Sequence, residues 1–205
     1  MRQIRLTKTR ENNIIYVIMH KFDFRVDTVS LKKMFIPECI YNNIYEINAE
    51  TLIDCGKCGL VFDIDNTVAP YETPRPTQQM KDYFASLVRA GIQIAFVSNN
   101  KNTRTDIFNE ELGFFCVTEA AKPSPKGVLK CIEHMNLGKE KMLLIGDQIF
   151  TDCLAAHRAG IECYLVKPIK DKKTLFFRAK RFLEKPFIRI YNKRKAKKQE
   201  INEKV

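Results

Sequence analysis

Apolar segments of strand length alternate with amphipathic segments of helix length from residue 60 onward, and this alternation constrains the fold more than any other feature. Short, apolar runs that predict buried strands occupy residues 60–64, 92–97, 114–118, 142–146 and 161–166. Helical spacing of apolar residues is found between them, at residues 77–89, 103–112, 124–137 and 151–159. Helices between buried strands imply right-handed βαβ units. The sequence therefore predicts an α/β fold with a doubly wound parallel sheet.

The segments that flank this pattern differ from it. Residues 31–47 have apolar side chains at helix-like intervals, broken by Pro37, and we expect them to pack on the core. Residues 171–205 predict a basic amphipathic helix that Pro186 kinks or splits, with a disordered tail from residue 192. We thus expect three parts: a poorly ordered extension (1–30), the core domain (31–170) and a C-terminal helix with its tail (171–205).

The net charge is concentrated in the C-terminal segment. The chain has 35 Lys and Arg against 24 Asp and Glu, a net charge of +11. Residues 170–198 contain 13 of these basic residues and two acidic ones, so this segment alone accounts for the +11. We expect its apolar residues, Leu175, Phe176, Phe182, Leu183 and Phe187, to share one helix face. Peripheral contact with an anionic membrane, contact with RNA, and packing on the core with a solubilising tail all stay open.

Hydropathy and cysteine content indicate a cytoplasmic protein. No apolar run approaches the roughly 20 residues that span a bilayer, and residues 14–19 are too short an apolar stretch for a signal peptide. Residues 1–10 contain no acid, which leaves a targeting segment or an upstream start open. The seven cysteines are scattered, as in a reduced protein. Cys55 and Cys58 form a C-x-x-C pair, but no second pair completes a zinc site, which favours two small residues in a turn.

Polar motifs follow four of the predicted strands. They are F-D-I-D-N-T at residues 62–67, S-N-N at 98–100, A-K-P at 121–123 and G-D-Q-I-F-T-D at 146–152. Each alone has a simpler explanation, such as a helix cap for Ser98 or a solvated loop charge for Lys122. Active sites of open parallel sheets lie at the carboxyl ends of strands, so the four together indicate one catalytic site. Its candidate residues are Asp63, Asp65, Thr67, Ser98, Asn99, Lys122, Asp147 and Asp152.

These motifs, in this order, resemble those of the haloacid dehalogenase (HAD) superfamily of aspartate-nucleophile phosphatases. The resemblance covers roughly residues 33–185 and is closest to the capless subfamily III A and its YqeG family, to which the mitochondrial phosphatidylglycerophosphate phosphatases are related. It implies a HAD-like Rossmannoid core. Only about 30 residues separate Asp65 from Ser98, and about two dozen separate Ser98 from Lys122, which leaves no room for a cap domain. An uncapped site suits a bulky phosphorylated substrate.

Phosphoryl chemistry and the resemblance imply the same catalytic roles. Asp63 would be the nucleophile that forms an aspartyl-phosphate, and Asp65 would be the general acid and base. Ser98, Asn99 and Lys122 would bind the phosphoryl oxygens, Ser98 and Lys122 where negative charge spreads in the transition state.

A metal ion and two supporting residues complete the expected site. The Asp63 and Asp147 carboxylates and the Asp65 backbone carbonyl are hard oxygen ligands that suit Mg²⁺. Asp152 would support this metal or orient the phosphate-binding lysine. Thr67 would brace the nucleophile loop.

The sequence thus predicts an Mg²⁺-dependent phosphomonoesterase. By resemblance, the leading substrate is phosphatidylglycerophosphate, so we expect a cytoplasmic enzyme with peripheral membrane contact. Two alternatives stay open: the same chemistry on a soluble nucleotide, sugar phosphate or phosphoprotein, and a basic RNA- or ribosome-associated binding module. The intact set of catalytic residues favours an enzyme.

Overall fold

The computed structural model describes residues 33–170 and 175–202 of the chain. Residues 37–171 form one compact unit, the core unit. The long helix α8 (Leu175–Asn202) belongs to a second unit, together with the described residues 33–36. The predicted extension at residues 1–30 lies outside the described residues.

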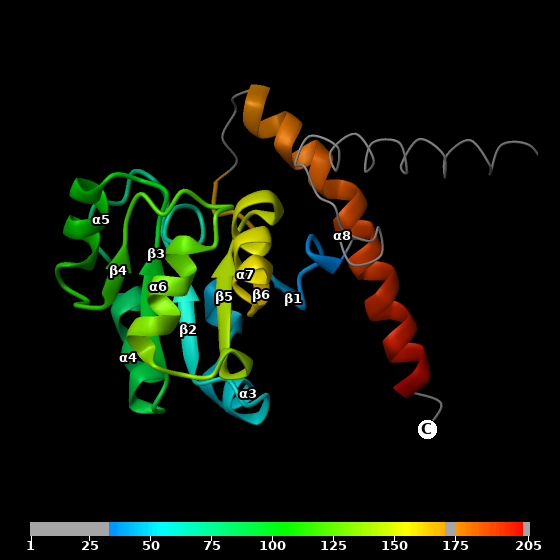
Figure 1. Cartoon of the computed structure of the whole chain (residues 1–205), viewed down its shortest axis with the longest axis horizontal. Helices are drawn as coiled ribbons and strands as arrows, with labels where there is room; N and C mark the ends of the chain where they lie inside the picture. Colours follow the sequence, from blue (N-terminus) through cyan, green and yellow to red (C-terminus); the bar gives the residue numbers. More distant parts are fainter. Residues whose placement is uncertain (1–32, 171–174, 203–205) are drawn as a thin grey trace, which may run out of the picture. The chain divides into compact units, whose positions relative to one another are not determined.

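A six-stranded sheet forms the centre of the core unit (Figure 1). All of its strand pairs are parallel, and the strand order is β1-β6-β5-β2-β3-β4. β2 therefore lies between β3 and β5, which confirms the doubly wound α/β fold. The strands are β1 (Cys39–Tyr41), β2 (Gly59–Phe62), β3 (Gln93–Val97), β4 (Phe115–Val117), β5 (Met142–Gly146) and β6 (Glu162–Val166).

Helices cover both faces of this sheet, as the strand order requires. In Figure 1, α6 and α7 lie side by side in front of the sheet and α4 lies behind it. A π-helical turn, η3, leads from the end of β5 into α7. The helical elements of the core unit are η1 (Ile44–Glu46), α3 (Ala49–Asp54), α4 (Gln78–Arg89), α5 (Asn102–Asn109), α6 (Lys126–Met135), η2 (Lys139–Lys141), η3 (Ile149–Cys153) and α7 (Leu154–Ala159).

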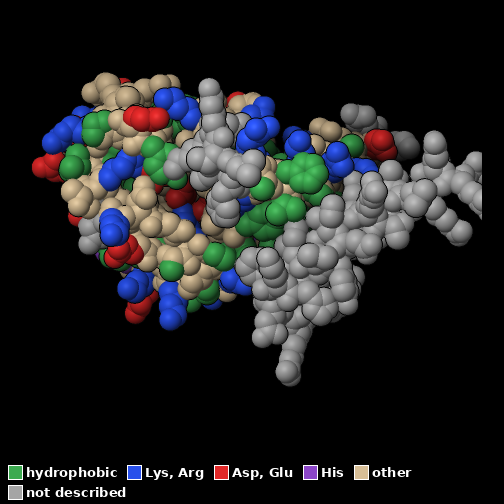
Figure 2. Space-filling view, turned by 90° about the horizontal axis from the view of Figure 1, so that it is seen from above, with side chains coloured by type: hydrophobic (Ala, Val, Ile, Leu, Met, Phe, Trp, Pro, Cys, Tyr) green, Lys and Arg blue, Asp and Glu red, His purple; other side chains and the backbone are tan. Residues whose placement is uncertain are grey.

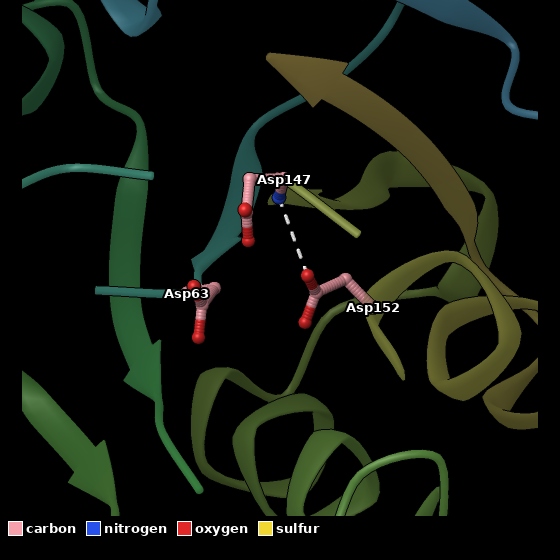
Figure 3. Close-up of side chains that lie close together, drawn as sticks. All are labelled: Asp63, Asp147 and Asp152. Atoms are coloured by element: carbon pink, nitrogen blue, oxygen red, sulfur yellow. Dashed lines mark hydrogen bonds between the residues drawn. The ribbon is translucent and has the colours of Figure 1, made fainter. Parts of the chain in front are cut away.

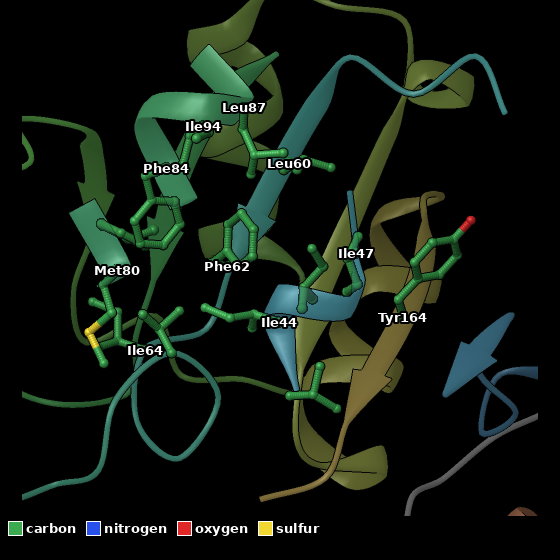
Figure 4. Packing of buried hydrophobic residues seen from close by; sticks show 14 of the residues in the cluster. Ile44, Ile47, Leu60, Phe62, Ile64, Met80, Phe84, Leu87, Ile94 and Tyr164 are labelled. Atoms are coloured by element: carbon green, nitrogen blue, oxygen red, sulfur yellow. The ribbon is translucent and has the colours of Figure 1, made fainter. Parts of the chain in front are cut away.

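Strand side chains alternate between two buried faces, as the period of a strand dictates. Leu60 and Phe62 point to the face that α4, η1 and α3 cover, where the Phe62 ring lies 5.3 Å from the Phe84 ring of α4 (Figure 4). Val61, between them, is fully buried on the other face. Because β2 is covered on both sides, only the residues after its carboxyl end can meet a ligand.

The two connections beside β2 are too short for a cap domain. Between β2 and β3 the chain holds one loop and α4, and between β3 and β4 it holds α5. Both connections lie within the described residues, and neither contains an inserted domain. Within the described connections, therefore, no cap domain is inserted beside the carboxyl end of β2.

Two sequence predictions about the flanking segments are wrong. The segment 31–47, predicted to be helical, contains strand β1 and the single turn η1, because β1 pairs with β6 at the sheet edge (Cys39 opposite Tyr164). The second wrong prediction is the disordered tail from residue 192, because α8 continues through Pro186, which therefore does not split it, to Asn202. The predicted tail is therefore helical through residue 202, as its Lys, Arg, Ala and Gln content favours.

The predicted apolar face of α8 also needs correction. Phe187 is buried, whereas Phe182 is 59% exposed, so these two residues do not share a face. The side chains of Leu175 and Phe176 lie outside the described part of the structure. Within that part, no helix has both the length and the apolar character needed to cross a membrane.

Candidate active site

The candidate residues gather where β2, β3 and β5 end. Asp63 directly follows β2, and its backbone N–H donates to the Ile145 carbonyl of β5 (2.9 Å), which extends the ladder by one residue. Figure 2, viewed from above, shows acidic and basic side chains together in a recess of the core unit. The strand ends thus bring distant motifs to one place.

A buried lysine joins three of the motifs. The Lys122 Nζ lies 2.5 Å from Oδ1 of Asp63 and 2.7 Å from Oδ1 of Asp152, and it donates to the Val97 carbonyl at 3.1 Å. The other carboxylate oxygen of Asp63, Oδ2, accepts from the Thr67 hydroxyl at 3.0 Å. Both oxygens of Asp63 are therefore held by donors, which fixes the orientation of its carboxylate.

Three carboxylates converge beside this lysine. Side-chain oxygens of Asp63, Asp147 and Asp152 all lie within 4.8 Å of one another, and the three residues are buried (Figure 3). Asp152 Oδ2 accepts from the backbone N–H of Asp147 (3.2 Å) and of Gln148 (3.0 Å). A Cβ on Gly146 would stand 2.4 Å from the Asp152 Cβ, so this close approach needs glycine. Among the described residues, this is the one group that could hold a metal ion.

The charges of the cluster do not balance by themselves. Three carboxylates face one ammonium group, so the ionised cluster carries a net charge of −2. Burial, offset in part by Lys122, together with Asp152 and Asp147 raises the pKa of Asp63 to about 7. The neighbouring acids raise the pKa of Lys122 although burial opposes this, so the lysine keeps its charge. A divalent cation would neutralise the excess charge.

Asp65 is bound by donors that follow β3 rather than by Lys122. Its Oδ2 accepts from the Asn100 amide (2.7 Å) and from the Ser98 hydroxyl (3.4 Å), and Arg104 forms an ion pair with its Oδ1. Arg104 also donates to the backbone carbonyls of Pro70 (2.7 Å) and of its neighbour, Tyr71 (2.8 Å). Asp65 thus has its own set of donors, whereas Lys122 pairs with Asp63 and Asp152.

Asn99 contacts the backbone of the lysine loop. Its Oδ1 accepts from the Lys122 N–H at 2.7 Å, and its Nδ2 donates to the Lys122 carbonyl at 3.0 Å. Both polar groups of the amide are used in this way. In this arrangement Asn99 positions Lys122, whereas the sequence suggested direct phosphate binding.

The structure brings together all eight residues that the sequence singled out. It adds Asn100 and Arg104, both of which contact Asp65. Asn100 lies in the S-N-N motif, so its neighbourhood was visible in the sequence. Arg104 lies in the first turn of α5. No pattern in the sequence around it predicts an ion pair with Asp65.

Comparisons with known proteins identify the family of this chain. Residues 65–160 match the haloacid dehalogenase-like hydrolase family. The chain is 34% identical over 155 residues to "Probable phosphatase YqeG" of Bacillus subtilis, and the match covers 76% of this chain and 90% of that protein.

Two more distant similarities are also found. The chain is 26% identical over 161 residues to phosphatidylglycerophosphate phosphatase 1, chloroplastic/mitochondrial, of Arabidopsis thaliana. That match covers 71% of this chain but 44% of the plant protein, so the chain spans less than half of its length. A solved structure of a hypothetical protein from Xanthomonas campestris superimposes with a TM-score of 0.47 at 17% identity, covering 62% of this chain and 72% of that one.

The assignment rests on the sequence match to the bacterial phosphatase, which extends over most of both chains. The family match spans the region from Asp65 to Gly160 and so includes three of the four motifs and part of the first. The chain therefore belongs to the haloacid dehalogenase-like hydrolases and, within them, to the YqeG family of phosphatases.

Proposed function

We propose that the protein is an Mg²⁺-dependent phosphatase that forms an aspartyl-phosphate on Asp63, and that its substrate is the lipid phosphomonoester phosphatidylglycerophosphate. The observation that best supports this proposal is the environment of the Asp63 carboxylate. It is buried, oriented by Lys122 and Thr67, and clustered with Asp147 and Asp152. A carboxylate that is fixed at a strand end and flanked by a cation is suited to attack phosphorus.

The proposed reaction has two steps. In the first, a carboxylate oxygen of Asp63 bonds to phosphorus, the bond from phosphorus to the alcohol oxygen breaks, and Asp65 gives the alcohol its proton. In the second, Asp65 takes a proton from water, whose oxygen attacks phosphorus and releases inorganic phosphate and free Asp63. Lys122 stabilises the negative charge on the phosphoryl oxygens in both steps. Asn99 positions Lys122 through its backbone.

The acidic cluster fits a magnesium ion. The carboxylates of Asp63 and Asp147 and the backbone carbonyl of Asp65 would hold it, and Asp152 would fix the backbone of Asp147 through its hydrogen bond. When bound, the ion neutralises charge on the transferred phosphoryl group. The net charge of −2 within the cluster supports a divalent cation.

Two observations support a lipid phosphomonoester as the substrate. One relative of this chain is a phosphatidylglycerophosphate phosphatase by name. The site also has no cap domain in the described connections beside β2, so a headgroup that projects from a bilayer could reach it. A soluble substrate does not need such open access.

A substrate panel with two variants tests this proposal. Purified protein is assayed with an aryl phosphate, soluble sugar and nucleotide phosphates, and phosphatidylglycerophosphate in mixed micelles, with Mg²⁺ and with EDTA. We expect the highest kcat/KM for the lipid and no turnover in EDTA. Asp63→Asn should abolish turnover. Asp65→Asn should reduce it least for substrates with good leaving groups, because a general acid matters most when the leaving alcohol is basic.

The results separate the parts of the proposal. Wild-type turnover by folded Asp63→Asn would refute the nucleophile assignment. Equal losses for Asp65→Asn across a leaving-group series would refute the general acid. Efficient hydrolysis of a soluble phosphate with none of the lipid would leave the chemistry intact and refute the substrate.

A further inference from the structure

The two faces of α8 differ in burial and charge. Glu184, Phe187 and Tyr191 are buried, and the Phe187 ring lies 5.1 Å from the ring of Phe35 in the same unit. Glu184, one of the few acids of this basic segment, pairs with Arg181 at 2.9 Å. This face of the helix is therefore already engaged in packing, and its acid is neutralised.

The opposite face carries a row of exposed basic residues. Its members recur at intervals of three and four, which places them on one side of a helix. We call this row the basic stripe; it consists of Arg178, Phe182, Lys185, Arg189 and Lys193, all exposed. Phe182 is the one aromatic residue of the stripe, and it is 59% exposed. The Lys185 Nζ lies 5.7 Å from the centroid of its ring. An exposed aromatic ring on a basic helix face leaves apolar surface in water, which marks a candidate interaction site.

We propose that the basic stripe binds the surface of an anionic lipid bilayer, with Phe182 inserted among the headgroups. Helices that lie in the membrane interface combine Lys and Arg on a polar surface with a Phe, Leu or Trp that enters the acyl boundary. Basic residues close to a membrane are attracted to the negative surface potential of its anionic lipids. Phe182, flanked by Arg178 and Lys185, supplies the apolar contribution on the same face as the basic residues.

Two features favour a bilayer over RNA as the partner. Proteins that bind single-stranded nucleic acid stack successive bases on several aromatic side chains, whereas the stripe has one aromatic residue. The stripe also exposes an apolar ring beside its charges, which the acyl boundary of a bilayer accommodates. The proposal does not depend on the catalytic assignment, because binding is measured without turnover.

Vesicle flotation of the full-length protein tests the stripe. The probes are vesicles of pure phosphatidylcholine and vesicles with added phosphatidylglycerol. The stripe variant replaces Arg178, Lys185 and Arg189 with Gln. The matched control replaces three exposed lysines of the core unit, Lys130, Lys139 and Lys141, with Gln, and so has the same net charge. A third variant, Phe182→Gln, removes the apolar residue alone.

The proposal predicts a specific pattern of binding. The wild type and the control should bind the anionic vesicles and not the neutral ones. The stripe variant should bind at least about tenfold more weakly, and Phe182→Gln should also lose affinity. Circular dichroism and aryl phosphate turnover should not change, since neither variant touches the catalytic cluster.

Three results would overturn it. Equal losses in the stripe and control variants would mean that net charge alone drives binding. Unchanged binding by Phe182→Gln would exclude insertion. Absence of wild-type binding to anionic vesicles would exclude the membrane as the partner, and salt-sensitive binding to single-stranded RNA in that case would assign the stripe to RNA.

Discussion

Arg104 links Asp65 to the loop that follows β2. Its guanidinium pairs with Asp65 and donates to the carbonyls of Pro70, Tyr71 and Thr73, so one side chain holds both the acid and the loop. This planar fork of donors has no equivalent in lysine, whose single ammonium group cannot reach the same set of acceptors. Arg104 is therefore a positioning residue for the proposed general acid.

Replacement of Arg104 by lysine should lower kcat while leaving KM for a soluble substrate nearly unchanged. General acid catalysis contributes about 10²–10⁴-fold, so a displaced Asp65 should cost roughly tenfold or more. The measurement is steady-state kinetics with an aryl phosphate. Arg75→Lys is the matched control, because Arg75 pairs with Glu110 and Glu111 on the exposed surface. An equal fall in both variants would contradict a specific role for Arg104.

The pKa of Asp63 makes metal binding depend on pH. Burial, Asp152 and Asp147 raise it to about 7 despite Lys122, so without a divalent cation the carboxyl carries a proton below that pH. The native state then binds this proton more tightly than the unfolded state, whose Asp titrates near 3.9. The contribution of Asp63 to metal-free stability therefore falls as pH rises from about 4 to 7. A bound cation must displace this proton, so its apparent affinity should fall about tenfold per pH unit below 7.

Thermal unfolding with and without Mg²⁺ at pH 6, 7 and 8 measures this effect. The increase in Tm on adding Mg²⁺ should be smallest at pH 6 and largest at pH 8. Asp63→Asn removes the titrating group and should flatten the dependence on pH. A Tm increase of equal size at all three pH values in the wild type would contradict the raised pKa.

The strands that the sequence predicted well are those marked by apolar runs, including the half-buried edge strand β4. All five predicted strands are present within two residues of their expected bounds, because β2, β3, β5 and β6 are apolar runs between helices. β1 was missed because its three residues lie between Glu38 and the Asn42-Asn43 pair, so no apolar run of strand length marks it. Its half-buried side chains carry too short a pattern to separate a strand from a helix.

The gathering of the four polar motifs at strand ends was equally predictable, whereas the contacts between them were not. The motif residues occupy strand ends, which a parallel sheet brings to one edge. Two of these contacts depend on loop conformations that sequence spacing does not encode. They are the ion pair between Oδ1 of Asp63 and Lys122, and the hydrogen bonds of Asn99 to the backbone of Lys122. The same holds for Arg104, whose partner is set by how the loop after β2 folds back on α5.

The packing of η3 against the end of β5 gives a prediction at the level of elements. Gly146→Ala would place a Cβ 2.4 Å from Asp152, so η3 must move and Asp152 must leave Lys122 or the Asp147 amide. Overpacking of this kind costs about 1–3 kcal/mol, measured by urea unfolding, and turnover should fall with it.

Gly59→Ala is the matched control for that substitution. Its Cβ would meet flexible side-chain ends, Leu137 Cδ1 at 2.8 Å and Met142 Cγ at 3.0 Å, at the amino end of β2. We expect a loss of stability with turnover per folded molecule retained. Full activity in Gly146→Ala would show that the position of Asp152 is not needed for the reaction.

At the scale of the whole molecule, the core unit is net acidic, with 14 Lys and Arg against 18 Asp and Glu, whereas basic residues dominate the segment that contains most of α8. Residues 170–198 account for the whole net charge of +11. If the basic stripe binds the bilayer and the proposed substrate is a lipid, α8 raises the local concentration of substrate. Binding and catalysis would then be separable properties of two parts of one chain.

Kinetics on two physical forms of substrate test this separation. The stripe variant (Arg178, Lys185 and Arg189 to Gln) should raise the apparent KM for phosphatidylglycerophosphate in anionic vesicles, since each basic residue near the surface contributes about 1 kcal/mol. Its kcat should not change, and neither should its kinetics with an aryl phosphate. The effect should shrink at high salt in the wild type, because ions screen the attraction. A stripe variant that loses activity equally on both substrates would show that α8 supports the catalytic site rather than the encounter with the membrane.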